Sequence, residues 1–307
     1  MTDWKTEIAV AARRIGPHIV RTPVMTSDSL WAGGEIQLKL EQLQHTGSFK
    51  ARGAFNNLLT RKVPESGIVA ASGGNHGAAA AFAAQRLGMK ARIFVPELAG
   101  PAKIALIRRT GADLEVCQGV YADALDAAMA HEKSSGAIQL HAYDAQETVV
   151  GQGTTFSEWD DQGLDADTVL IAVGGGGLIA GAMAWFGRDK KIVAVEPETA
   201  ATLNSALASG PETEVEVSGI AANALGARKI GNICYGLARE ARLQSVLVSD
   251  AAIADARDQL WTCHRMLVEP AGAAGLAALS SGAYAPEPEE RVAVLVCGAN
   301  PAPDPLS

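Results

Sequence analysis

The chain is poor in cysteine, and the few cysteines it has are scattered. Its 307 residues include only Cys117, Cys234, Cys263 and Cys297. No two of them form a CxxC pair, and Cys263-His264 has no second pair to complete a set of metal ligands. The spacing therefore predicts neither a zinc site nor a disulfide framework.

The chain also lacks an excess of basic residues. Lys and Arg total 26 against 34 Asp and Glu, which gives a net charge of -8 and a pI near 5.3. Without a basic stripe, nucleic acid is a poor candidate partner. An acidic surface is not attracted to anionic membranes either, so we expect no membrane partner.

No apolar run is suited to crossing or entering a membrane. Residues 168–186 carry no charge, but four consecutive glycines interrupt them, so we expect a buried strand, loop and helix. The first ten residues mix charges with apolar side chains and lack the core of a signal peptide. These features predict a cytoplasmic protein.

The length predicts about two domains, and a hydrophobic content of 48% allows a large core. Short apolar runs alternate with helical patterns, which indicates an α/β fold with mostly parallel sheets covered by helices on both faces. The predicted strands are 36–40, 68–71, 91–95, 114–117, 169–173, 192–195, 245–248 and 292–296. The predicted helices are 4–15, 50–59, 77–87, 102–110, 122–133, 149–160, 178–186, 199–208, 251–265 (with Asp250 as N-cap) and 273–279.

The run Gly174-Gly175-Gly176-Gly177 follows a strong strand and opens a helix. Glycines let backbone N–H groups approach an anion, and the helix N-terminus adds positive potential, so the run predicts a phosphate cradle. A dinucleotide fingerprint is the rival, with Glu196 as the ribose-binding acid. However, the G-x-G-x-x-G offsets fail in every register. A purely structural turn is the remaining alternative.

A second loop, Ser72-Gly73-Gly74-Asn75-His76, also lies between a strand and a helix. Its backbone N–H groups and the Ser72 hydroxyl can hold a carboxylate. The alternative is that Ser72 caps the helix and Asn75 is a turn residue. Beyond the last strand, Cys297-Gly298-Ala299-Asn300 forms a third small-residue loop, in which a buried structural cysteine is the alternative.

Lys50 begins a predicted helix directly after Phe49, within Thr46–Ala54. A lysine amine can form an imine with a carbonyl cofactor, and an aromatic ring can cover one face of a planar heterocycle. A surface lysine that opens an amphipathic helix is the alternative. The combination of this segment with the glycine-rich loops in this order favours the catalytic interpretation.

These motifs resemble the fold-type II pyridoxal-phosphate enzymes, the threonine/serine dehydratase and serine racemase family, over about residues 21–300. The resemblance implies a two-domain, tryptophan synthase β-like fold. Residues 1–66 and 145–307 would form a large cofactor-binding domain, residues 67–144 a small domain, and the active site would lie between them. It also implies a homodimer that acts on a small amino-acid substrate.

The same resemblance assigns roles to the motifs. Lys50 would hold pyridoxal 5'-phosphate and, once freed, remove the Cα proton of the substrate. Asn75 would donate a hydrogen bond to the phenolic oxygen of the cofactor, and Cys297 would face its pyridine nitrogen. The other cofactor-binding residues would be Phe49, Gly174, Gly175, Gly176, Gly177 and Glu269, and the residues for the substrate carboxylate would be Ser72, Gly73, Gly74, Asn75 and His76. Glu269 as an exposed helix cap is the alternative for that residue.

The implied reaction is elimination of water from L-threonine or L-serine, giving a 2-oxo acid and ammonia. A neutral thiol cannot firmly protonate the pyridine nitrogen, which suits quick loss of a β-substituent. The racemases resembled here carry a serine at the position of Gly73, as the acid or base on the opposite face. The glycine therefore favours a dehydratase over a racemase.

The racemase-like members also bind a divalent cation. The matching positions are Glu196, the Ala200 carbonyl and Thr202, where an aspartate is expected. One anionic ligand is therefore missing, and we predict no firm magnesium or calcium site.

Three further hypotheses remain open from the sequence. The first is a dehydratase of another β-hydroxy amino acid, such as 3-hydroxyaspartate or phenylserine. The second is a non-catalytic binding protein that retains the cofactor. The third, based on Gly174–Gly177 and Glu196, is a nucleotide-binding oxidoreductase.

Overall fold

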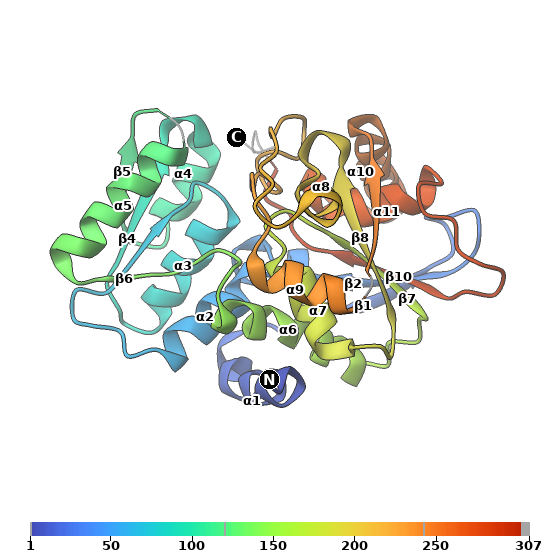
Figure 1. The fold of residues 1–307 in the computed structure, drawn as a ribbon, viewed down its shortest axis with the longest axis horizontal. Coiled ribbons are helices and arrows are strands. Elements are labelled where there is room, and N and C mark those ends of the chain that lie inside the picture. Colours follow the sequence, from blue (N-terminus) through green and yellow to red (C-terminus); the bar gives the residue numbers. More distant parts are fainter. Residues whose placement is uncertain (1, 120, 242, 302–307) are drawn as a thin grey trace.

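Two sheets, each flanked by helices, form two lobes of an α/β structure (Figure 1). The computed structural model describes residues 2–119, 121–241 and 243–301. The larger sheet has the strand order β1-β2-β10-β7-β8-β9, and the smaller has the order β5-β4-β3-β6. The strands are β1 (Val24–Ser27), β2 (Ile36–Leu40), β3 (Ile68–Ala71), β4 (Ala91–Pro96), β5 (Asp113–Cys117), β6 (Ile138–Gln139), β7 (Thr168–Ala172), β8 (Lys191–Pro197), β9 (Gln244–Val248) and β10 (Val292–Val296).

The helices alternate with these strands along most of the chain, which confirms the predicted fold class. They are α1 (Trp4–Ile15), α2 (Lys50–Thr60), α3 (Asn75–Arg86), α4 (Pro101–Arg108), α5 (Tyr121–Ser135), α6 (Gln146–Asp161), α7 (Gly177–Phe186), α8 (Thr202–Ser209), α9 (Asn232–Ala241), α10 (Asp250–His264) and α11 (Pro270–Ser280). Among the described residues, every strand pair is parallel except β1 with β2.

Strand β3, in the interior of the smaller sheet, is buried on both faces, which explains why it is apolar at every position. Ile68 and Ala70 of β3 face the cluster that contains α2 and α3, whereas Val69 and Ala71 face α5. Alternate residues of a strand point to opposite faces, so a strand covered on both sides must be apolar throughout.

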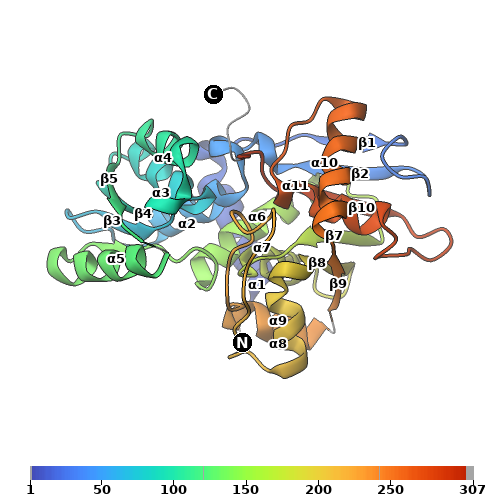
Figure 2. The same ribbon diagram turned by 90° about the horizontal axis from the view of Figure 1, so that it is seen from above.

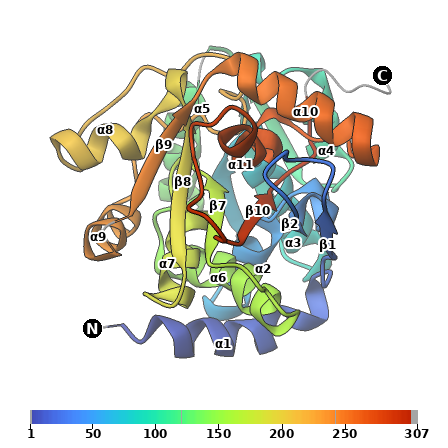
Figure 3. The same ribbon diagram turned by 90° about the vertical axis from the view of Figure 1, so that its right-hand side faces the viewer.

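The larger sheet follows the same rule. Every residue of β7 and of β10 is buried. Helices α10 and α11 pack together on one face of this sheet, α6 and α7 lie on the other, and α1 packs against α6 and α7 (Figure 3). In the part of the chain that the structure describes, no helix is long and apolar enough to cross a membrane.

The strands of the larger sheet come from residues 24–40 and 168–296, and those of the smaller sheet come from residues 68–139. Figure 2 shows the two lobes from above, with α2 and α6 between them. Helix α2 belongs to neither lobe alone, because it packs against α6 and also against α3. The domain boundaries at residues 66/67 and 144/145 stay predictions, and α2 joins the two cores across them.

Two strands and one α-helix were not predicted from the sequence, and one predicted cap is wrong. The missed elements are β1, β6 and α9. The N-cap of α10 is Ser249, whose side chain accepts a hydrogen bond from the Ala252 N–H, rather than Asp250. Asp250 instead accepts a hydrogen bond from the backbone of Ile220.

Candidate active site

Lys50 is held beside the end of β10 by the backbone that precedes it. Ser48 forms a bridge with Gly298, and the Phe49 N–H donates to the Cys297 carbonyl at 3.3 Å. This pairing fixes where α2 begins. The sequence therefore places its first lysine next to Cys297, although the two residues are far apart along the chain.

The Lys50 side chain lines a pocket, and among the described residues its amine donates one hydrogen bond, to a backbone carbonyl. Nζ donates to the Ala142 oxygen at 2.9 Å and lies 5.0 Å from the centre of the Phe49 ring. Burial lowers the pKa of Lys50 to about 8, and the nearby Cys297 and Glu269 oppose that shift. A sizeable fraction of the amine is therefore neutral near pH 7 to 8, as a general base requires.

The glycine run forms one wall of the same pocket. It follows β7 and leads into α7, whose first N–H groups have no acceptor within the helix. A Cβ at Gly175 would lie 2.3 Å from the Tyr143 ring, and one at Gly174 would lie 3.0 Å from the Leu225 backbone. Gly176 has a φ of 91°, which favours glycine. Side chains at these positions would therefore fill the space beside this wall, which glycines leave open.

Two pocket residues carried no signal in the sequence. Tyr143 packs over Gly175 and Gly177 and donates from its hydroxyl to the Lys229 carbonyl at 3.3 Å. Leu225 lies in an irregular loop before α9. Both come from connecting segments, where residue type alone indicates no site.

The loop Ser72–His76 reaches the pocket through Asn75. Asn75 Nδ2 donates to Glu269 Oε1 at 2.6 Å, and both residues line the pocket. Ser72, Gly73, Gly74 and His76 do not line it. They lie beside it at the carboxyl end of β3, where α3 begins and its N–H groups point outward.

His76 is neutral in this structure. Burial, followed by the charge of Lys50, lowers the pKa of His76 to about 3. Its Nε2 lies 2.9 Å from the Leu140 carbonyl, which can only accept, so Nε2 carries the proton. The side chain therefore offers no further N–H, and a carboxylate at this position would meet the backbone N–H of His76.

Gly73 is closed to side chains. A Cβ there would lie 2.3 Å from the Ala99 Cβ and 2.9 Å from Val95 Cγ1. A serine at this position would therefore require the Ala99 segment to move. The packing around Gly73 therefore leaves no room for a side chain at this position.

Cys297 is buried, and its Sγ donates to the Ala271 carbonyl at 3.3 Å. Burial, together with the charge of Glu269, raises the pKa of the Cys297 thiol far above its usual value. The thiol therefore stays protonated, as the sequence analysis assumed. Glu269 is also buried, which removes the alternative of an exposed helix cap.

Glu196, the weak metal candidate, already has a full set of donors. Its carboxylate accepts hydrogen bonds from the N–H groups of Leu203 (2.7 Å) and Asn204 (2.8 Å), and from the Thr202 hydroxyl. Glu196 belongs to β8, is fully buried, and directs its carboxylate at the start of α8. Its burial raises its pKa. Glu196 therefore caps a helix, and the same contacts make it unsuitable for binding a ribose.

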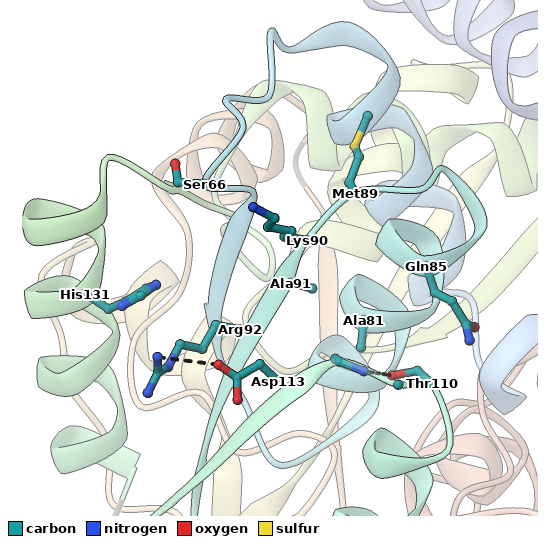
Figure 4. Close-up of a pocket in the computed structure, with 12 residues that line it drawn as sticks. Ser66, Ala81, Gln85, Met89, Lys90, Ala91, Arg92, Thr110, Asp113 and His131 are labelled. Carbon is teal, nitrogen blue, oxygen red and sulfur yellow. Dashed lines mark hydrogen bonds and ion pairs between the residues drawn. The ribbon is translucent and has the colours of Figure 1, made fainter.

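A wider hollow in the smaller lobe is separate from this pocket (Figure 4). It is lined by Ser66, Lys90, Arg92, Asp113 and His131, among others, at the amino ends of β4 and β5. Parallel sheets bind ligands beyond their carboxyl ends, where the Ser72 loop lies. Arg92 is moreover paired with Asp113 (3.4 Å) and Glu115 (2.6 Å).

Comparisons with known proteins agree with this geometry. Residues 15–298 match the model of the family described as pyridoxal-phosphate dependent enzyme. The chain belongs to that family. Pyridoxal phosphate is therefore its cofactor. The hypothesis of a nucleotide-binding oxidoreductase is ruled out by this family membership.

Three relatives illustrate the similarity. An L-threonine ammonia-lyase of Thermotoga maritima is 33% identical, covering 96% of this chain and 75% of that protein. The crystal structure of a T.th. threonine deaminase is 35% identical, with a TM-score of 0.88 and coverage of 98% and 99%. The structure of maize serine racemase is 30% identical, with a TM-score of 0.89 and coverage of 96% and 93%.

Other relatives at 32–33% identity are named phenylserine dehydratase (Ralstonia pickettii) and L-threo-3-hydroxyaspartate ammonia-lyase (Pseudomonas sp.). The chain is thus a threonine dehydratase-like lyase, and its relatives differ in substrate.

The residues of the pocket fit this cofactor. Gly174–Gly177 would provide N–H groups for its phosphate, Lys50 a partly neutral amine, and Cys297 a protonated thiol. The protein is an enzyme in which all the cofactor-binding positions predicted from the sequence border one pocket.

Proposed function

We propose that this chain is an L-threonine/L-serine dehydratase, which eliminates water from its substrate to give an enamine that takes up a water and hydrolyses to a 2-oxo acid and ammonia. The observation that carries the proposal is the placement of Lys50. Its amine, with a pKa of about 8, lies in the pocket that Asn75 and Gly174–Gly177 also border. A single base placed between a carboxylate loop and a phosphate cradle suits proton removal at Cα.

The roles of the chain follow from its groups. Backbone N–H groups of the Ser72–His76 loop hold the substrate carboxylate, and Gly174–Gly177 hold the cofactor phosphate. The neutral Lys50 amine accepts the Cα proton. When bound, the cofactor supplies the electron sink that makes this proton acidic.

The closed space at Gly73 supports a dehydratase over a racemase. In the described residues around Gly73, a side chain would collide with Ala99 and Val95. The matching measurement is chiral analysis of the amino acid that remains during turnover. Accumulation of D-serine at a rate similar to ammonia release would reject this preference.

The pocket also favours an uncharged β-substituent. Among its lining residues, Lys50 is the only cation, and the wall contains Tyr143, Ala224 and Leu225. A second carboxylate, as in 3-hydroxyaspartate, would find no dedicated cationic partner among these lining residues.

The experiment is a panel of L-threonine, L-serine, phenylserine and 3-hydroxyaspartate, assayed for ammonia with and without added pyridoxal phosphate. We expect the highest kcat/KM with threonine or serine. A higher value for one of the other two would replace the proposed substrate. Absence of elimination from all four would favour a cofactor-retaining binding protein.

A homodimer is part of this proposal. Leu43, Trp261 and Leu267 are each at least 42% exposed, and their neighbours Gln42 and Met266 are in contact. An apolar surface of this kind is typical of a protein interface. Analytical ultracentrifugation of the wild type and of Trp261→Glu tests it, and a wild-type monomer at working concentration would reject it.

A further inference from the structure

Asn300 joins three segments of the chain at the edge of the Lys50 pocket. It follows β10, and no role for it was predicted from the sequence. Its Nδ2 donates to the Thr46 carbonyl at 2.7 Å and to Asn75 Oδ1 at 2.9 Å. Thr46 precedes Lys50, and Asn75 begins α3, so one amide group links the lysine segment to the carboxylate loop.

These contacts fix which way the Asn75 amide faces. A carbonyl oxygen can only accept, so both partners of Asn300 require its NH₂ group. With its Oδ1 occupied by Asn300, Asn75 must direct Nδ2 to the opposite side, where it donates to Glu269 Oε1 at 2.6 Å. An amide NH₂ has two hydrogens, and the second is available to an occupant of the pocket.

The backbone before Lys50 is shaped to fit Asn300. Thr46 has a φ of 60°, a left-handed conformation that is costly for a threonine. At Gly47, a Cβ would lie only 2.7 Å from Asn300 Oδ1. The Ala299 N–H also donates to the Gly47 carbonyl at 2.9 Å. The turn therefore accommodates the Asn300 amide closely.

We propose that Asn300 is a positioning residue for the cofactor. It does not touch the cofactor itself. It holds the Asn75 amide with the donor, not the acceptor, toward the phenolic oxygen that Asn75 is proposed to bind. The inference depends on the Asn75 role and on the cofactor, but not on which amino acid is the substrate.

The test is a double-mutant cycle on cofactor affinity. Apo forms of the wild type, Asn300→Ala, Asn75→Ala and the double variant are titrated with pyridoxal phosphate, followed by visible absorbance. We expect each single variant to bind about tenfold more weakly. The double variant should bind no more weakly than Asn75→Ala alone, because Asn300 acts through Asn75.

Asn300→Asp and Asn300→Ser sharpen the test. The carboxylate of Asn300→Asp cannot donate to either carbonyl and would attract the Asn75 NH₂ group, so we expect a larger loss than with alanine. We also expect its bound cofactor to show a shifted pH titration of absorbance. Asn300→Ser keeps one donor and should bind with intermediate affinity, and the exposed Asn232→Ala is the matched control.

Two outcomes overturn the proposal: wild-type affinity in Asn300→Ala, or single-variant losses that multiply in the double variant. Melting temperatures of the apo proteins identify a variant that is merely unfolded, in which case Asn300→Ser provides the cycle. Cofactor binding without ammonia release would reject the proposed function and leave this inference intact.

Discussion

Lys39 and Lys50 lie close together in the sequence, but Lys39 is fully buried and Lys50 is half-buried at a pocket, and their surroundings are opposite. Lys39, on β2, is fully buried and donates to the Thr22 carbonyl (2.9 Å), Glu158 (2.6 Å) and Gln162 (2.6 Å). Lys50 lines a pocket and, among the described residues, donates to a single carbonyl. The first lysine is part of an ion-pair network, whereas the second is kept available.

The network around Lys39 extends to α2 itself. Arg52 pairs with Glu41 at 2.7 Å and with Glu158 at 2.9 Å, and Arg52 and Glu41 are completely buried. Burial alone would lower the pKa of Arg52, but Glu41 and then Glu158 raise it above its usual value. Two residues apart on one helix, Arg52 has two carboxylate partners, and Lys50 has none within ion-pair distance in the described part of the chain. A buried ion pair is costly to break by removing one partner, whereas a buried amine without a carboxylate partner has a shifted pKa and stays reactive.

Replacing Lys50 should have the largest effect on activity. With Lys50→Ala, ammonia release should fall by about a thousandfold or more, because the proposed base is lost. The visible absorbance of protein-bound cofactor should change as well. Steady-state assays of Lys50→Ala and of the exposed Lys62→Ala measure the difference. Unchanged 2-oxo acid production by Lys50→Ala would contradict the comparison.

Replacing Arg52 should instead damage the fold. Arg52→Met leaves the carboxylates of Glu41 and Glu158 buried with less compensation, so we expect a loss of about 3 to 5 kcal/mol in the free energy of unfolding. Urea denaturation of the apo protein measures it, with the exposed Arg13→Met as control. A change below about 1 kcal/mol would show that the network contributes little.

This contrast also shows what the sequence could and could not predict. The eight predicted strands all exist. Apolar runs identified the strands that are buried throughout, such as β3 and β10, whereas β2, with the sequence IQLKL, shows an alternating pattern. Strand β6 has two residues and β1 is a short antiparallel edge, so neither gives a strong pattern. Lys50 and the glycine run could be identified because their chemistry is written in neighbouring residues.

The contacts between distant residues could not be predicted. Lys39 meets Glu158 through the packing of β2 against α6, and Asn300 meets Thr46 across most of the chain. No local pattern indicates either pair. The sequence therefore identified the reactive groups, and the structure was needed to find what holds them in place.

The lowered pKa of Lys50 should reduce the free energy of unfolding of the apo protein. The folded pKa of about 8 lies below the usual 10.5, so the folded apo protein binds this proton less tightly than the unfolded chain. Lys50→Met should therefore stabilise the apo protein by about 1 to 2 kcal/mol at pH 7, a value reduced because the Lys50 side chain is only half-buried.

The pH dependence gives this prediction its sign. Between pH 8 and 10.5 the unfolded wild type binds more protons, so its stability rises with pH relative to the variant. The advantage of Lys50→Met should be complete below pH 8 and vanish above pH 10.5. Urea denaturation of both apo proteins at several pH values measures it, and an advantage that grows with pH would contradict it.

The smallest effect should come from replacing Glu269, whose nearby charge opposes the lowering of the Lys50 pKa. Burial lowers the pKa of Lys50, while the nearby Glu269 carboxylate raises it, so Glu269→Gln should lower that pKa further. The pH dependence of Lys50 acylation in the apo protein, followed by peptide mass spectrometry, measures the change. Exposed lysines such as Lys62 provide the internal control. A rise in the pKa of Lys50 would mean that Glu269 does not act on it as a charge, and that burial alone sets its reactivity.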